Sequence, residues 1–170
     1  QGFQITPLEL MRVASAAVNG GYLITPHIGK ALLDETGQTV ETFSYEKGAQ
    51  VLSEETSATM RKILESVVAE GTGNKAAVAG YRIGGKTATS EKLPRRSGKY
   101  IASFLAFAPA EDPEVMALLL IDEPQGTYYG GTVAGPVMGE FLSQVLPYLK
   151  VPQTKTEEVE MLVEVPQVTG

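Results

Sequence analysis

The pattern of apolar and polar residues predicts two helices in the first half of the chain. After Thr6, a residue suited to capping, apolar side chains recur every three or four positions until Asn19–Gly21 breaks the pattern. A second apolar stripe follows the capping residue Ser53 and ends at Gly71–Gly73. Residues 22–47 lie between them with a turn signal in the middle, so we expect a hairpin-like excursion there.

Three extended segments follow, at about Tyr81–Ser90, Tyr100–Ala108 and Glu114–Ile121. The turns between them, at Pro94–Gly98 and Pro109–Pro113, are short, and short connections favour antiparallel neighbours. The third segment is apolar on both faces. We therefore expect it to be a central strand that is covered on both sides.

A last helix is expected to open around Thr132 and Pro136, and Pro147 should bend or end it. Beyond Lys150 the composition shifts to Val, Pro, Gln, Thr and Glu, which is typical of a linker.

The composition changes this picture little. The chain has 170 residues, 43% apolar and 20% charged, which suits one globular domain with a short appendage. No apolar run approaches the roughly 20 residues of a membrane span, and no leader opens the chain, so a targeting segment would lie outside this sequence. The absence of cysteine excludes disulfides, zinc fingers and thiol nucleophiles, and His27 is the single histidine.

The charge is unevenly distributed. A net charge of −6 argues against a general nucleic-acid binder. Between Arg82 and Lys99, however, six basic side chains face only Glu91. Such a cluster fits either a site for a small anion or carboxylate, or a solvated loop with stray basic residues.

One motif points to a nucleotide-binding protein. Residues Gly80–Thr87 satisfy the P-loop pattern G-x-x-x-x-G-K-[ST], and Leu118–Glu123 resembles the apolar strand that ends in Asp-Glu in such ATPases. A P-loop needs a helix to begin at its Lys-Thr pair. Here residues 88–94 are rich in strand formers and end at a proline, which makes an NTPase the weaker alternative.

The same residues support a second interpretation. Gly84–Thr89 resembles the Lys-Thr-Gly strand motif of penicillin-binding proteins and serine β-lactamases. The resemblance to this family extends along the whole chain, in order and with sensible spacings. Further matching segments are Gly2–Leu8, Asn19–Gly21, Gly71–Gly73, Phe107–Pro109, Asp122–Pro124 and Tyr129–Pro136, and Val163–Gly170 resembles the opening of a PASTA repeat.

The resemblance implies the C-terminal part of the transpeptidase domain of a class B penicillin-binding protein. The implied fold is α+β, an antiparallel five-stranded sheet with helices on both faces, of which this chain would hold three strands. Residues 1–150 would belong to the transpeptidase domain, 151–162 to a linker and 163–170 to the start of a PASTA-like repeat. The resemblance implies no cofactor and no metal.

The residues themselves suggest a carboxylate clamp, because a lysine and hydroxyls on a strand can hold and orient an anion. By resemblance, Lys86 and Thr87 hold the carboxylate of the substrate or of penicillin. Thr89 helps to orient it, and the Thr89 N–H forms half of the oxyanion hole, where such donors contribute roughly 3 kcal/mol each. Ala88 stands where the family usually has glycine, which puts full activity in doubt.

Two elements of the family are missing from the sequence. Its nucleophile lies in a helical Ser-x-x-Lys, but the only such pattern here, Ser44–Lys47, is polar and in the wrong order along the chain. No Ser-x-Asn occurs. We therefore expect the nucleophile to lie outside this chain, and the chain alone to be inactive.

The resemblance implies a D,D-transpeptidase that cross-links peptidoglycan stem peptides ending in D-Ala-D-Ala and is acylated by β-lactams. It would act at the extracytoplasmic face of the membrane, anchored by a segment absent here. Ala88 leaves open a non-catalytic β-lactam sensor or scaffold of the same fold. Without the remainder of the transpeptidase domain, we expect the chain to self-associate or to hold a partner fragment tightly.

Overall fold

A computed structural model describes residues 4–154. These residues form two compact units, one up to Met60 and the other from Arg61 onward. The PASTA-like segment predicted at 163–170, and the linker beyond residue 154, lie outside the described residues.

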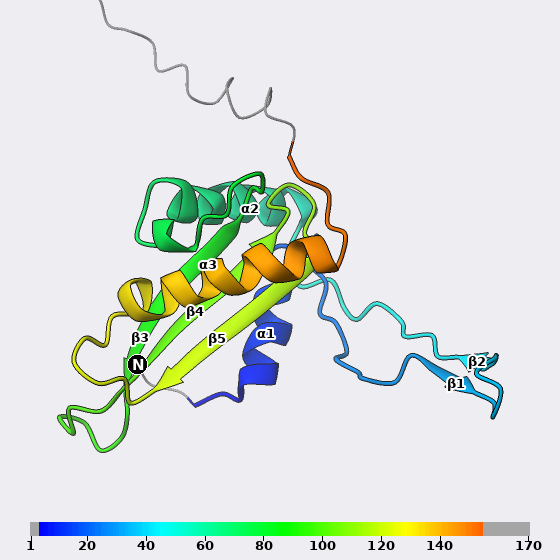
Figure 1. The fold of residues 1–170 in the computed structure, drawn as a ribbon, viewed down its shortest axis with the longest axis horizontal. Helices are drawn as coiled ribbons and strands as arrows, with labels where there is room; N and C mark the ends of the chain where they lie inside the picture. The colour runs from blue at the N-terminus through cyan, green and yellow to red at the C-terminus, as the bar shows by residue number, and fades with distance from the viewer. Residues whose placement is uncertain (1–3, 155–170) are drawn as a thin grey trace, which may run out of the picture. The chain divides into compact units, whose positions relative to one another are not determined.

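The first unit contains helix α1 (Pro7–Ala16) and the two-stranded antiparallel pair β1 (Ala31–Leu33) and β2 (Thr39–Thr42). The predicted cap is present, since the Thr6 hydroxyl accepts a hydrogen bond from the Glu9 N–H at 3.3 Å. The expected excursion between the first two helices is confirmed as this hairpin (Figure 1). Helix α2 (Glu54–Ala69) begins in this unit and ends in the second.

The second unit is built on a three-stranded antiparallel sheet in the order β3-β4-β5 (Figure 1). After α2, its elements are the short 3-10 helix η1 (Asn74–Ala76), the strands β3 (Gly84–Glu91), β4 (Tyr100–Ala108) and β5 (Val115–Asp122), and helix α3 (Gly130–Tyr148). Helix α3 starts two residues before the predicted position and ends one residue after Pro147.

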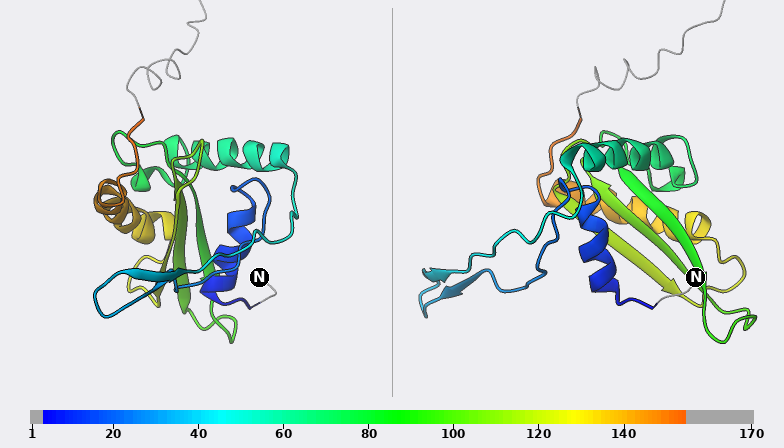
Figure 2. Two further views of the ribbon diagram at one scale, coloured as in Figure 1. Left: turned by 90° about the vertical axis from the view of Figure 1, so that its right-hand side faces the viewer. Right: turned by 180° about the vertical axis from the view of Figure 1, so that it is seen from behind.

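Helix α3 covers one face of this sheet, as the edge-on view in Figure 2 shows. The core between them is fully buried and joins large side chains of the helix to an alanine-rich stripe of the central strand. Its members include Phe104, Ala106 and Ala108 of β4, and Met138, Leu142 and Leu146 of α3. The small alanines let the helix axis approach the sheet closely.

The expectation that the third strand is central is wrong for the described residues. β4 has a neighbour on each side, whereas β5 lies at an edge. On β5, Leu119 packs against the core but the next residue, Leu120, is 42% exposed. A run that is apolar on both faces predicts two-sided burial, but on the face away from α3 Leu120 stays exposed.

Candidate active site

The chain continues as a strand where a P-loop would begin a helix. Lys86 and Thr87 lie in the middle of β3, paired with Leu105 and Phe104 of β4. A P-loop receives its phosphate at a helix that begins at this Lys-Thr pair, and here the pair continues as strand to Glu91. The NTPase interpretation is therefore wrong.

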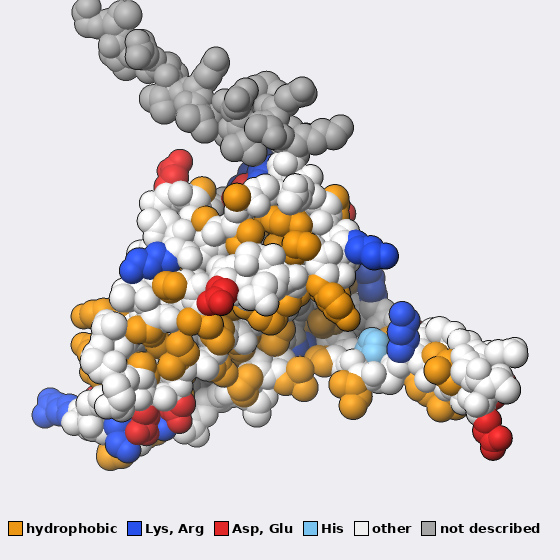
Figure 3. Space-filling model, in the orientation of Figure 1, with side chains coloured by type: hydrophobic (Ala, Val, Ile, Leu, Met, Phe, Trp, Pro, Cys, Tyr) orange, Lys and Arg blue, Asp and Glu red, His pale blue; other side chains and the backbone are white. Residues whose placement is uncertain are grey.

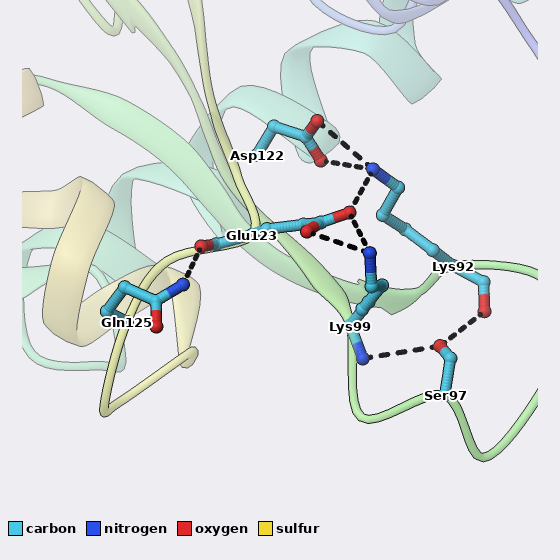
Figure 4. Close-up of polar contacts among 6 residues, drawn as sticks. All are labelled: Lys92, Ser97, Lys99, Asp122, Glu123 and Gln125. Atoms are coloured by element: carbon cyan, nitrogen blue, oxygen red, sulfur yellow. Dashed lines mark hydrogen bonds and ion pairs between the residues drawn. The ribbon is translucent and has the colours of Figure 1, made fainter.

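The acidic pair that completed the NTPase pattern has a different role. The Lys92 ammonium lies 2.9 Å from Asp122 and 2.8 Å from Glu123, and Lys99 lies 3.2 Å from Glu123 (Figure 4). Hydrogen bonds from Lys92 and then Lys99 lower the pKa of Glu123, and the bonds to Glu123 and then Asp122 raise the pKa of Lys92. These carboxylates therefore tie the end of β5 to the loop between β3 and β4.

Two glycines allow β3 to reach its position. The aromatic ring of Phe107 covers Gly84 on one face of the sheet, and a side chain at that position would collide with it. On the other face, a Cβ at Gly85 would lie 2.7 Å from the ring of Phe104. Both rings are fully buried, so neither can move aside cheaply. The glycines preceding Lys86 are thus required by packing.

The edge of β3 that faces away from β4 has no strand partner among residues 4–154, and we name it the open edge. Just beyond the strand, the Lys92 N–H donates to the Lys99 carbonyl, which marks this register position as a hydrogen-bonded pair. In an antiparallel ladder such pairs occur at every second residue, so residues an even number of positions before Lys92 point their N–H and C=O groups toward β4. Thr87 and Thr89 are an odd number of positions before Lys92. Their N–H and C=O groups therefore face the open edge.

Three threonine hydroxyls gather on the α3 side of this edge. The Thr72 and Thr87 hydroxyl oxygens are 3.2 Å apart, and the Thr89 hydroxyl accepts a hydrogen bond from the Gly130 N–H at 3.0 Å. The sequence analysis gave Gly71–Gly73 as a helix stop and as a segment that matches the family, but it assigned no role to Thr72. The matched Gly-Thr-Gly element was the one signal that could have suggested it.

Lys86 reaches the same edge from the opposite face. Its Nζ donates to the Thr87 carbonyl at 2.7 Å, and that carbonyl points to the open edge. Within residues 4–154, no carboxylate forms an ion pair with it. Three other members of the basic cluster, Arg82, Lys92 and Lys99, form ion pairs with carboxylates. Arg82, for example, donates two hydrogen bonds of 2.6 and 2.7 Å to Glu65. The cluster is therefore not one continuous anion site, and Lys86 is distinct from it.

Ala88 lies on the exposed face of β3, together with Lys86 and Ser90. Because side chains alternate along a strand, its methyl group points away from Thr87, Thr89 and helix α3. The extra methyl therefore does not disturb the contact between β3 and α3.

The remaining sequence candidates lie apart from this arrangement. Ser44 and Lys47 are in a segment without helix, and the Lys47 ammonium sits 4.3 Å above the ring of Tyr22. His27 is exposed and stacks on Tyr45 with ring centroids 3.3 Å apart. The Ser44–Lys47 match consequently lacks the helix that the family motif needs.

Tyr128 and Tyr129 lie in the connection before α3. Tyr128 stacks on Tyr100 with centroids 4.0 Å apart, and Tyr129 follows at 4.8 Å and is 60% exposed. The hydrogen bond with Tyr129 is the main cause that raises the pKa of Tyr128. Their packing partner is thus the start of β4 rather than the body of the last helix.

Over the described part of the chain, no three histidine or acidic side chains come close enough together to hold a metal ion. None of the helices in that part has the length and apolar character needed to span a membrane.

Comparison with known proteins gives a consistent result. Residues 1–143 match the penicillin binding protein transpeptidase domain. Stage V sporulation protein D of Bacillus subtilis is 45% identical over 184 residues, which cover 100% of this chain and 28% of that protein. The probable peptidoglycan D,D-transpeptidase PenA of Neisseria flavescens is 36% identical, over 97% of this chain and 40% of its own length.

Solved structures agree. The transpeptidase domain of Burkholderia pseudomallei penicillin-binding protein 3 superposes with a TM-score of 0.75 at 34% identity, covering 91% of this chain and 45% of that one. The D,D-transpeptidase domain of an Eggerthella lenta peptidoglycan glycosyltransferase gives 0.72 at 29% identity, over 87% and 33% of the two chains. The chain thus spans less than half the length of these relatives. Its antiparallel sheet with helices has the α+β fold of their domains, and the chain belongs to the penicillin-binding protein transpeptidase family.

Proposed function

We propose that this chain supplies the carboxylate-binding side of a peptidoglycan D,D-transpeptidase active site. The observation that carries the proposal is the convergence at the open edge of β3. The Lys86 ammonium, the hydroxyls of Thr87 and Thr89, and two backbone N–H groups all meet there. Such a set matches a ligand with a terminal carboxylate beside a reacting carbonyl.

Each group has a role in this chemistry. Lys86 supplies the positive charge that attracts the carboxylate of a peptide ending in D-Ala-D-Ala, and Thr87 and Thr89 donate hydrogen bonds that fix its orientation. Thr72 joins them through its contact with Thr87. The Thr89 N–H, which faces the open edge, stabilises the oxyanion as the carbonyl is attacked.

The nucleophile in this proposal is a serine on polypeptide outside the chain. Its oxygen attacks the carbonyl between the two D-Ala residues, the terminal D-Ala leaves as an amine after taking a proton, and an acyl-serine remains. The amine of a second stem peptide then displaces the serine. A β-lactam undergoes the same first step. The serine attacks the lactam carbonyl and the C–N bond of the ring opens, but the nitrogen remains attached to the acyl group and cannot leave.

Replacing Lys86 tests the proposal in the full-length protein. We expect Lys86→Ala to lower the rate of acylation by labelled penicillin by about 100-fold, because one charge-assisted contact to the carboxylate, of roughly 3 kcal/mol, is lost. Lys86→Arg should restore part of the rate because it keeps the charge. Lys62→Ala, an exposed lysine of α2, is the matched control. A folded Lys86→Ala protein that acylates at the normal rate would refute the proposal.

The non-catalytic sensor is the second candidate, and Ala88 is the observation behind it. A sensor is acylated by penicillin but does not cross-link peptides. Supplying a stem peptide and an acceptor amine to the acylation-competent protein therefore separates the two. Formation of a cross-linked product favours the enzyme.

The exposed apolar surface supports a further partner in this proposal. Along α3, the side chains of Val137, Phe141 and Tyr148 are 44%, 48% and 83% exposed, and hydrophobic side chains gather over this face in Figure 3. We propose that the remainder of the transpeptidase domain covers them, and that the chain alone self-associates or keeps a partner fragment. A compact monomer in sedimentation that binds no hydrophobic dye would contradict this.

The location and the end of the chain complete the proposal. A protein with this function acts at the extracytoplasmic face of the bacterial membrane, held by an anchor outside this chain. Residues 163–170 would open a PASTA-like repeat after a linker over 151–162. Sequencing the gene on both sides of this segment tests both statements. An apolar span of about 20 residues upstream would supply the anchor, and a complete repeat downstream would supply the PASTA domain. The same upstream sequence would show whether a helical Ser-x-x-Lys and a Ser-x-Asn are present.

A further inference from the structure

The first residue of α3 donates its N–H to a side chain of the candidate site. The N–H groups of the first helical turn lack acceptors within their own helix. Tyr129, the residue before α3, provides no side-chain cap, and the Gly130 N–H donates instead to the Thr89 hydroxyl at 3.0 Å. This bond is partly buried and joins residues 41 positions apart.

The bond determines what the Thr89 hydroxyl can do. A threonine hydroxyl has one hydrogen to donate and two lone pairs to accept with. Because the Gly130 N–H occupies one lone pair, the O–H hydrogen is directed away from Gly130 and can be donated, while one lone pair remains. Accepting a hydrogen bond also polarises the O–H group and strengthens its donation. Thr89 is thus prepared to donate to a ligand.

Glycine is required at the start of α3 for this approach. A Cβ at position 130 would collide with the Ala88 carbonyl oxygen and lie 2.5 Å from that of Ser103. At the next position, a Cβ on Gly131 would lie 2.5 Å from the Thr72 carbonyl oxygen. Both obstacles are backbone atoms, so a side chain would have to push the helix start away from β3.

The connection before α3 is fastened at both ends. At its start, Asp122 and Glu123 bind Lys92 and Lys99, as Figure 4 shows. At its end, Tyr128 stacks on Tyr100, the first residue of β4. These contacts hold the helix start in register with the end of β3, so the bond between Gly130 and Thr89 does not depend on the helix alone.

We propose that Gly130 is a positioning residue, whose N–H fixes Thr89 as a hydrogen-bond donor and so makes the site prefer a carboxylate to a carboxamide. The inference rests on the proposed function. A carboxylate offers two acceptor oxygens. In this arrangement Thr89 donates to one of them, and Thr87 donates to the other when Thr72 is the donor in the contact between the Thr72 and Thr87 hydroxyls. A carboxamide of the same shape offers one acceptor and an NH2 group, which leaves one hydroxyl without an acceptor.

The test compares acylation rates of the full-length protein with benzylpenicillin and with its carboxamide analogue. We expect Gly130→Ala and Thr89→Val each to reduce the preference for the carboxylate by about 10-fold or more, the worth of one hydrogen bond to a charged group. The double variant should be no worse than Thr89→Val. Thr89→Ser, which keeps the hydroxyl, and Gln144→Ala, an exposed site on α3, should keep the preference.

A second variant removes the donor without adding an atom. Replacing Gly130 by glycolic acid turns its amide into an ester and deletes only the N–H, so it remains informative if Gly130→Ala does not fold. The ester should also lose the preference. An unchanged preference in the folded ester variant would overturn the inference, as would a loss from Gly130→Ala that adds fully to that of Thr89→Val. A wild-type protein that penicillin does not acylate would overturn the proposed function as well.

Discussion

The two outer strands of the sheet have the same length and the same partner but opposite character. β3 and β5 each contribute eight residues and each pair with β4. β3 begins with two glycines and then carries two charged residues, Lys86 and Glu91, and four small ones between them, whereas β5 is apolar at nearly every position. Both strands lie at an edge of this sheet, but only the edge of β3 combines an unpaired backbone with the lysine and threonines of the proposed site. The strand with the larger side chains, β5, offers area for packing.

The largest effect is expected when β3 receives a large side chain of the kind that β5 carries. We expect Gly85→Val to lower the free energy of unfolding by about 3 kcal/mol, because its Cβ would lie 2.7 Å from the buried ring of Phe104 and 2.8 Å from a backbone oxygen. Urea unfolding of wild type and variant measures the difference.

The matched control is Ala88→Val on the exposed face of the same strand. It should change the free energy of unfolding by less than about 0.5 kcal/mol, since nothing described opposes the larger side chain there. Equal losses for the two variants would show that the strand as a whole, and not the space above Gly85, limits side-chain size.

Truncating neighbouring leucines on β5 sharpens the comparison. In the chain alone, Leu119→Ala should cost about 2 kcal/mol because Leu119 packs against the core, and Leu120→Ala should cost less than about 1 kcal/mol. If the remainder of the domain covers this strand, the cost of Leu120→Ala should rise to that of Leu119→Ala in the full-length protein. Urea unfolding of the chain alone and of the full-length protein measures both costs. An equal cost of Leu120→Ala in the two forms would show that the remainder of the domain does not cover this face.

Removing the methyl group of Ala88 should have a smaller effect. Ala88→Gly is expected to lower the free energy of unfolding by about 0.5–1 kcal/mol, because glycine is more flexible in the unfolded chain. The rate of penicillin acylation in the full-length protein should change by less than about threefold, since the methyl points away from Thr87 and Thr89. A large gain in rate would mean that the methyl narrows the ligand cleft.

The smallest expected effect is the pH dependence of the ion cluster. The pKa of Glu123 lies below its usual 4.5 in the folded protein, so its contribution is complete above that pH and is lost as the pH falls through the lowered value. The pKa of Lys92 lies above its usual 10.5, so its contribution is complete below that pH and is lost as the pH rises further. The difference in melting temperature between wild type and Glu123→Gln should be constant between these limits and shrink in acid. A difference that persists in acid would indicate packing instead of charge.

The sequence predicted local features well and contacts between distant segments poorly. The Thr6 cap and the bounds of β4 follow from local pattern, and both are confirmed. β3 begins at Gly84 and not at Tyr81, since the Arg82 carbonyl accepts from Ala110, outside the register of the ladder. No local pattern could show this.

The candidate site divides in the same way. The motif placed Lys86 and Thr87 on a strand, and the structure confirms that placement. It could not reveal that Thr72 meets Thr87 or that Gly130 meets Thr89, because these contacts join residues 15 and 41 positions apart. Glycine and threonine are common turn and cap residues, so their identity alone does not indicate such contacts.

Residues 151–154, which follow α3, form hydrogen bonds with residues 80–81, which precede β3. Val151 is buried, its carbonyl accepts from the Tyr81 hydroxyl at 3.4 Å, and the Thr154 N–H donates to the Gly80 carbonyl at 2.8 Å. A mechanical load applied beyond Thr154 would therefore act first on these two hydrogen bonds and the buried Val151, and not on the last turn of α3.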